Sequence, residues 1–357
     1  MARFSPLMAS LPLLISLMSA TFQAQANNQL PDIGTAGVAA LPIEQEVRYG
    51  NAFMRFARAG LPIIDDPVLS EYIDDLGQRL LTNADGVRFP FTFFLINDPS
   101  INAAAFLGGR VKVHTGLFLY ADNESELASV LAHEITHVTQ RHIARYMEAQ
   151  ASSSAMTLAG LVGSIALAVI NPTAGIAALQ TTLGLSMQSA INYTRDNEYE
   201  ADRIGMKTLY DAGFDPMGMA NFFQKLAAEY RYASKPPEML LTHPLPETRI
   251  SEARARAGSY GARALPPSLD FWLAKVRIQV RYGTETPQAL LTYFDSRLQK
   301  GDYPLKDAAI YGKALALLQL KRTDEADTLM QELATRHPED LFVVDALTDI
   351  DLAKGRS

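Results

Sequence analysis

The sequence contains no cysteine and only one tryptophan among its 357 residues. Because cysteine is absent, disulfide bonds and thiolate metal sites are excluded, and a metal site must use histidine and carboxylate ligands. The formal net charge is -7 and no stripe of basic residues occurs, so we expect no nucleic-acid partner. The length is sufficient for a sizeable core and predicts two domains.

The apolar run near the N-terminus, residues 7–20, is too short to span a membrane. It follows Arg3 and precedes Ala24-Gln25-Ala26, which matches the cleavage pattern of secretory signal peptides. We therefore expect residues 1–26 to be a signal peptide, cut after Ala26, and the mature chain to be exported. The absence of cysteine excludes lipid anchoring at this site.

One stretch of helical periodicity carries the pattern H-E-x-x-H, with His133, Glu134 and His137. Residues four positions apart share a helix face, so both imidazoles can bind one divalent metal ion. Glu134 beside them suits a general base that takes a proton from the attacking water. The pattern alone occurs about as often on an ordinary solvated helix as in a zinc peptidase. Upstream, Asn123 and Glu126 predict a capped helix start, which favours the motif being on a regular helix.

A catalytic zinc site normally has three protein ligands and one open position, so a third ligand is needed. Gln140 and Ile143 stand where the metzincin pattern requires glycine and histidine, which excludes that class. Glu198 and Asp202 are four residues apart in another helical stretch, although this spacing alone is common on helix surfaces. We expect Glu198 to be the third ligand and Asp202 to hydrogen-bond a ligand histidine. Glu200, between them, would point to a different face.

These motifs, in this order, resemble the gluzincin metallopeptidases, a family that includes HtpX, the CAAX prenyl protease and the β-barrel assembly-enhancing proteases. The matching stretches are residues 101–106, 108–113, 115–117, 126–142, 197–205, 242–244 and 249–250. The resemblance covers most of residues 40–258, and the helical tail beyond is typical of the β-barrel assembly-enhancing (BepA) branch. It implies an α+β, mostly helical fold, in which a zinc metalloprotease domain at residues 27–258 combines a small β-sheet with the active-site helix.

The same resemblance places His243 and Arg249 at the border of the active site, as catalytic residues. A histidine there could donate to the developing oxyanion and aid catalysis. Its neutral form could instead occupy the fourth zinc position, displace the water and hold the enzyme latent. The sequence leaves both roles open.

A small sheet is predicted in the sequence before the helix that carries H-E-x-x-H. Residues 91–96 are rich in strand formers and predict a central strand, and Gly108-Gly109 predicts a turn. Residues 111–115 alternate as a strand that leads toward the metal helix. We expect an edge strand along the cleft, in which Gly109, Val111 and Val113 pair with an extended substrate backbone, as in proteases of this kind. The alternative is an ordinary edge strand.

Residues 149–194 contain no charged residue. The first apolar arm, residues 156–170, ends at Asn171-Pro172 and is shorter than the roughly 20 residues needed to span a bilayer. Three interpretations remain: a membrane-spanning hairpin, a helical flap over the active site, or a surface that contacts membrane or unfolded client. The length favours the flap, and a peripheral membrane contact stays open.

Beyond residue 258 the composition changes to helix pairs. Small and apolar residues follow the spacing of a 34-residue tetratricopeptide unit: Ile310, Ala314, Leu317, Ala326, Met330 and Pro338. Generic helical hairpins are the alternative. We expect residues 259–357 to be a tetratricopeptide-like repeat domain that docks protein partners. The sequence ends at Ser357 within the array, so a shortened repeat domain is one expectation.

The sequence therefore predicts an exported zinc metalloendopeptidase with His133, His137 and Glu198 as ligands and Glu134 as base. The resemblance implies a periplasmic protein that degrades misfolded or stalled outer-membrane proteins, has a chaperone-like role and docks the outer-membrane assembly machinery through its repeats. Two alternatives stay open. One is a catalytically latent chaperone or adaptor that binds clients through the repeats and the apolar segment, and the other is an integral-membrane protease.

Overall fold

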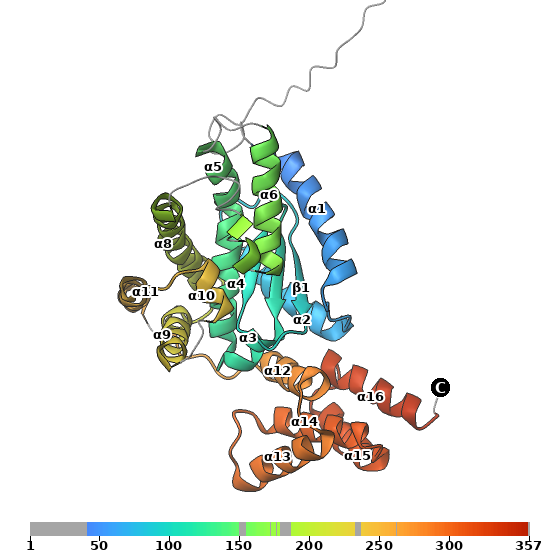
Figure 1. The fold of residues 1–357 in the computed structure, drawn as a ribbon. Coiled ribbons are helices and arrows are strands. Elements are labelled where there is room, and N and C mark those ends of the chain that lie inside the picture. Colours follow the sequence, from blue (N-terminus) through green and yellow to red (C-terminus); the bar gives the residue numbers. More distant parts are fainter. Residues whose placement is uncertain are drawn as a thin grey trace, which may run out of the picture. The chain divides into compact units, whose positions relative to one another are not determined.

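The computed structural model describes residues 41–149, 155–171, 173–175, 177–178, 187–232, 237–261 and 263–355 (Figure 1). The expected signal peptide, residues 1–26, lies outside these residues, as does part of the uncharged segment 149–194. The described chain is mostly helical, with one small sheet, which confirms the predicted fold class. That the C-terminal helices are tetratricopeptide repeats stays a prediction.

The sheet has three strands, β1 (Thr92–Ile96), β2 (Ala103–Phe106) and β3 (Arg110–His114), in the order β1-β3-β2. β3 pairs in parallel with β1 and antiparallel with β2. The predicted positions were therefore wrong for two strands: β1 is an outer strand and β3 is the central one. The apolar pattern of β1 reflects a sheet buried on both faces, which a central and an outer strand share.

Ten helices of the described chain surround or follow this sheet up to residue 260. They are α1 (Ile43–Gly60), α2 (Pro67–Leu81), α3 (Thr115–Tyr120), α4 (Glu124–Thr139), α5 (His142–Ala149), α6 (Ala155–Ile170), α8 (Met187–Asp211), α9 (Met217–Tyr232), α10 (Glu238–Thr242) and α11 (Glu247–Tyr260). α4 carries H-E-x-x-H and packs against α2, α8, α9 and β2. It begins as predicted, because the Asn123 side chain accepts a hydrogen bond from the Glu126 N–H at 3.0 Å.

The close approach of α8 to α4 depends on a glycine. A Cβ atom at Gly205 would lie 3.1 Å from the carbonyl oxygen of Ala132 and 3.2 Å from the Cα of His133. A larger residue would push the two helices apart at the first histidine of the motif. The small residue therefore lets α8 bring its carboxylates against the α4 histidines.

Five further helices make up the C-terminal part: α12 (Leu269–Tyr282), α13 (Pro287–Lys300), α14 (Lys306–Gln319), α15 (Thr323–Arg336) and α16 (Leu341–Ala353). Each helix from α13 to α15 packs against the next one in the chain, and α12 and α16 also contact α2. Within the described ranges, no helix combines the length and apolar composition needed to cross a bilayer.

A buried ion pair joins the C-terminal helices to α2. Arg277 of α12 donates through Nε to Asp66 Oδ2 at 2.7 Å and through Nη1 to the Tyr311 hydroxyl at 3.1 Å. Its Nη1 also lies 2.7 Å from Asp345 Oδ2 on α16. Asp66 is at the same time the N-cap of α2, since it accepts from the Leu69 N–H. The buried Asp66 carboxylate thus caps the start of α2 and also binds Arg277 of the C-terminal helices.

We predict that Arg277→Met lowers the free energy of unfolding by about 3 kcal/mol or more, because it leaves the Asp66 charge buried without its ionic partner. Urea denaturation followed by the fluorescence of Trp272, the single tryptophan, would measure it. The control is Arg322→Met, which removes an exposed pair with Glu325 and should change little. Equal stability of both variants would contradict this account.

Candidate metal centre

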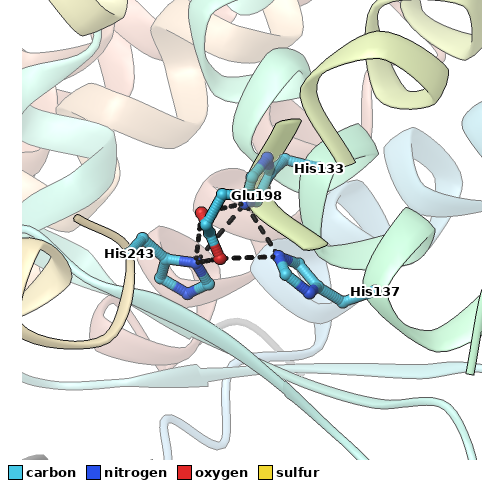
Figure 2. Close-up of side chains that lie close together, drawn as sticks. All are labelled: His133, His137, Glu198 and His243. Carbon is cyan, nitrogen blue, oxygen red and sulfur yellow. Dashed lines mark hydrogen bonds and ion pairs between the residues drawn. The ribbon is translucent and has the colours of Figure 1, made fainter. Parts of the chain in front are cut away.

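Four side chains from three parts of the fold meet at one point (Figure 2). His133 and His137 come from α4, Glu198 comes from α8, and His243 follows α10 directly. Each offers one ligand atom, and these atoms all lie within 4.8 Å of one another. The structure thus brings together the three ligands that the sequence predicts and His243, which the sequence analysis gave as a possible occupant of the fourth zinc position.

The distances within the cluster are short. His133 Nε2 lies 3.0 Å from His137 Nε2 and 3.3 Å from Glu198 Oε2. His137 Nε2 is 3.3 Å from Glu198 Oε1, and His243 Nδ1 is 3.1 Å from the same oxygen. Imidazole nitrogens and carboxylate oxygens that face one another across such a gap are a donor set suited to a divalent metal ion.

Glu198 brings a negative charge into the cluster. Glu198 is buried, and burial alone would raise its pKa, but His243, His137 and His133 outweigh this effect and hold the pKa well below its usual value. The carboxylate is therefore ionised inside the protein. Arg249 already compensates this buried charge, with Nη1 2.9 Å from Oε2, and a cation between the Glu198 oxygens and the imidazoles would compensate it further.

His133 is held from behind by a carboxylate. Asp202 Oδ1 lies 3.0 Å from His133 Nδ1, so the other ring nitrogen, Nε2, faces the cluster. Arg249 donates to both oxygens of Asp202, through Nε at 2.7 Å and Nη2 at 2.8 Å. Its Nη1 lies 2.9 Å from Glu198 Oε2. Arg249 is buried behind the ligands, where it orients two carboxylates and does not face the cleft.

Glu134 is buried beside the cluster, and its carboxylate contacts groups other than the three predicted ligands. Its Oε2 accepts a hydrogen bond from the Ala105 N–H at 2.8 Å, and its Oε1 lies 3.4 Å from His243 Nε2. Burial raises the pKa of this carboxyl, while the neighbouring His243 and His133 oppose the rise. A carboxylate with a raised pKa next to a cleft is suited to take up and release a proton.

A cavity of about 240 Å³ opens beside these groups. Residues of β2, α4, α5, α6, α8 and the end of α10 line it, among them Ala104, Ala105, Glu134, His137, His142, Ile165, Ala168, Val169, Glu198 and His243. The Lys112 ammonium group of β3 donates to the Val169 carbonyl and so ties α6 to the sheet. Part of the uncharged segment therefore covers the cleft. That it moves as a flap stays a prediction.

The strand expected to bind substrate does not border this cavity. β3 is paired on both sides, with β1 and with β2, and Val111 and Val113 are fully buried. The Gly109 carbonyl accepts a hydrogen bond from the Thr92 N–H at 2.8 Å, so it is occupied too. The expectation of an edge strand at Gly109, Val111 and Val113 was wrong, because the hairpin places β2 on the outer, cavity side.

One residue that touches the cluster is not among the site residues that the sequence predicts. His142, at the start of α5, places its Nδ1 2.8 Å from His137 Nδ1. Helical periodicity gave no reason to pair residues five positions apart. Glu200, in contrast, stays outside the cluster, as its place on the helix predicts, and contacts His142 instead.

Comparison with known proteins places this geometry in a family. Residues 67–257 match peptidase family M48. The chain is 54% identical over 322 residues to a putative β-barrel assembly-enhancing protease of Vibrio cholerae, covering 90% of this chain and 66% of that relative. It is 46% identical over 334 residues to the β-barrel assembly-enhancing protease of Escherichia coli, covering 94% and 68%.

A more distant relative is the metalloprotease LoiP of Escherichia coli, 28% identical over 210 residues, or 55% of this chain and 75% of that protein. The chain spans about two thirds of the length of the β-barrel assembly-enhancing proteases that it matches. The matched region contains all of α4, α8 and α10 and therefore the whole candidate centre. The chain belongs to peptidase family M48.

Proposed function

We propose that this chain is a zinc-dependent endopeptidase in which His133, His137 and Glu198 hold the metal ion. The observation that carries the proposal is the convergence of these three side chains next to Glu134 and a cavity. The ligand set has no sulfur and combines imidazole with carboxylate, as in catalytic zinc sites of peptidases. The Lewis acidity that polarises the scissile carbonyl and acidifies the attacking water would come from the zinc ion when it is bound.

Glu134 is the general base of this proposal. It takes the proton from the attacking water and later delivers it to the leaving amine. Its raised pKa favours the first of these steps, because the protonated carboxyl is then easier to form and hold. Its hydrogen bond from the Ala105 N–H keeps one oxygen fixed while the other faces the cluster.

In the described arrangement, His243 stands where it would fill the fourth coordination position of the metal ion, an arrangement that we call closed. Its Nδ1 lies 3.1 Å from Glu198 Oε1 and 3.4 Å from His133 Nε2, close enough to be a fourth ligand. A tetrahedral zinc site with four protein ligands has no position for the attacking water. Of its two possible roles, latency is therefore favoured over donation to an oxyanion, and the loop that carries His243 has to move before catalysis.

The edge of β2 takes over the proposed substrate-binding role. Ala105 directs its N–H away from β3 and toward Glu134, and Ala104 and Ala105 line the cavity. An extended peptide laid along this edge could add a strand to the sheet with its backbone beside the base. α6 contributes Ile165 and Val169 to the lining of the same cavity, and in this proposal it withdraws to admit such a peptide.

The names of the relatives direct the choice of substrate and location. By likeness to proteins called β-barrel assembly-enhancing proteases, we propose a periplasmic enzyme that acts on misfolded or stalled outer-membrane proteins. Helices α12–α16 would dock the assembly machinery. The second candidate function is a latent chaperone or adaptor, which the closed position of His243 and the cover by α6 favour.

We predict that Glu134→Gln lowers the rate of casein cleavage by about 100-fold or more, because the amide cannot take up the proton. The variant should still bind zinc, since Glu134 is not a ligand. The matched control is Glu44→Gln on the exposed face of α1, which should cleave at the wild-type rate. Equal client degradation by Glu134→Gln and wild type would leave only the binding function.

We predict that His243→Ala raises casein cleavage, because it frees the fourth position. The increase should be about tenfold if the closed arrangement is favoured by ~1.4 kcal/mol. Zinc content is measured alongside, with His337→Ala, a histidine of the C-terminal part, as the control. Lower activity with zinc retained would instead make His243 an oxyanion donor, and an unchanged rate would remove it from the site.

A further inference from the structure

The contact between His142 and His137 depends on a break in the helix. α4 ends at Thr139 and α5 begins at His142. On an unbroken helix, a residue five positions later would lie about 140° round the axis from His137 and could not reach its ring. In the structure the two Nδ1 atoms are 2.8 Å apart, and the ring centroids are 4.8 Å apart in an edge-on arrangement.

The break is made by a residue in a rare conformation. Arg141 has a φ of 53°, in the left-handed region that residues other than glycine seldom adopt. Such a conformation persists only where the surrounding structure holds it. Here Arg141 is buried and its Nε donates to the buried Glu46 carboxylate of α1 at 2.7 Å. The fold thus stabilises a strained turn, and this turn places the His142 ring against His137 of α4.

The far side of His142 is held by a second carboxylate. His142 Nε2 lies 3.3 Å from Glu200 Oε2, and Arg145 Nη1 lies 2.7 Å from the same oxygen. Burial would raise the pKa of Glu200, but the hydrogen bond and charge of Arg145 lower it, so the carboxylate is an acceptor. His142 therefore donates through Nε2, which leaves its Nδ1 to accept the Nδ1–H of His137.

The two α4 histidines consequently have supports of different kinds. Behind His133 lie Asp202 and then Arg249, whereas behind His137 lie His142 and then Glu200 with Arg145. In both cases a carboxylate and an arginine end the chain of contacts, and Nε2 of the histidine faces the cluster. The second support contains one additional imidazole.

We propose that His142 is a positioning residue of the metal centre, which fixes the tautomer and ring orientation of His137 so that its Nε2 can bind the ion. This rests on the proposed function, since it requires that the cluster binds zinc. Groups that orient ligand histidines in this way typically contribute about 10–100-fold to metal affinity. His142 acts through His137, so its effect should appear in zinc binding itself.

The test is the zinc affinity of the full chain, measured by competition with a chromophoric chelator. His142→Ala should bind zinc about 10–100-fold more weakly than wild type. His142→Gln should recover most of the loss, because its amide oxygen can accept from His137 and its amide nitrogen can donate to Glu200. His337→Ala is the matched control, since it removes a histidine paired with Asp307 at 2.6 Å on the C-terminal helices.

Two further measurements separate positioning from damage to the fold. The visible spectrum of the cobalt-substituted protein should shift in His142→Ala and return with His142→Gln. If His142→Ala does not fold, Glu200→Ala carries the test, because it leaves His142 in place but frees its ring, and zinc affinity should again fall.

Wild-type zinc affinity in a folded His142→Ala, or in Glu200→Ala where His142→Ala does not fold, would overturn the inference and leave the proposed function intact. Equal losses in His142→Ala and His142→Gln would also overturn it, because they would reflect packing and not hydrogen bonding. Absence of zinc binding by the wild-type chain would overturn the proposed function and this inference together.

Discussion

The structure depends on one buried negative charge, the carboxylate of Glu198 among three imidazoles. A carboxylate without compensation inside a protein costs several kcal/mol, so its position is stable only with partners around it. Those partners come from α4, from the loop after α10 and, through Arg249, from α11. The need to compensate one carboxylate therefore draws together elements that are far apart in the chain.

α8 supplies three carboxylates whose roles follow from their places on the helix. Glu198 and Asp202, four positions apart, face α4 and contact its first histidine from two sides. Glu200 lies on another face and reaches the start of α5 instead. A single helix thus supplies one ligand and part of the support for both histidines. Because Gly205 has no side chain, this helix can lie close to α4.

Much of this site could be predicted from local patterns. The helix start at Asn123 was read from capping chemistry, and the convergence of Glu198 with the two histidines followed from four-residue spacings. Strand order could not be read in this way, because a buried outer strand and a buried central strand have the same apolar pattern. The edge that borders the cleft is therefore β2, although the sequence had favoured β3.

The remaining differences have a common origin in long-range contacts. His142 would lie on the wrong face of a continuous helix, and only the left-handed conformation of Arg141, held by Glu46 from a distant helix, brings it to His137. Arg249 is likewise placed behind the ligands by its contacts with Asp202 and Glu198, which no spacing within α11 could indicate. Periodicity describes single helices, whereas these residues are positioned by other elements.

The central claim is that one zinc ion is held at the meeting point of α4 and α8. X-ray diffraction from crystals of the full chain grown with zinc, recorded on both sides of the zinc absorption edge, tests it most directly. The account predicts one strong anomalous peak within bonding distance of His133 Nε2, His137 Nε2 and a Glu198 oxygen. Absence of a peak there, or a peak bound by other residues alone, would contradict it.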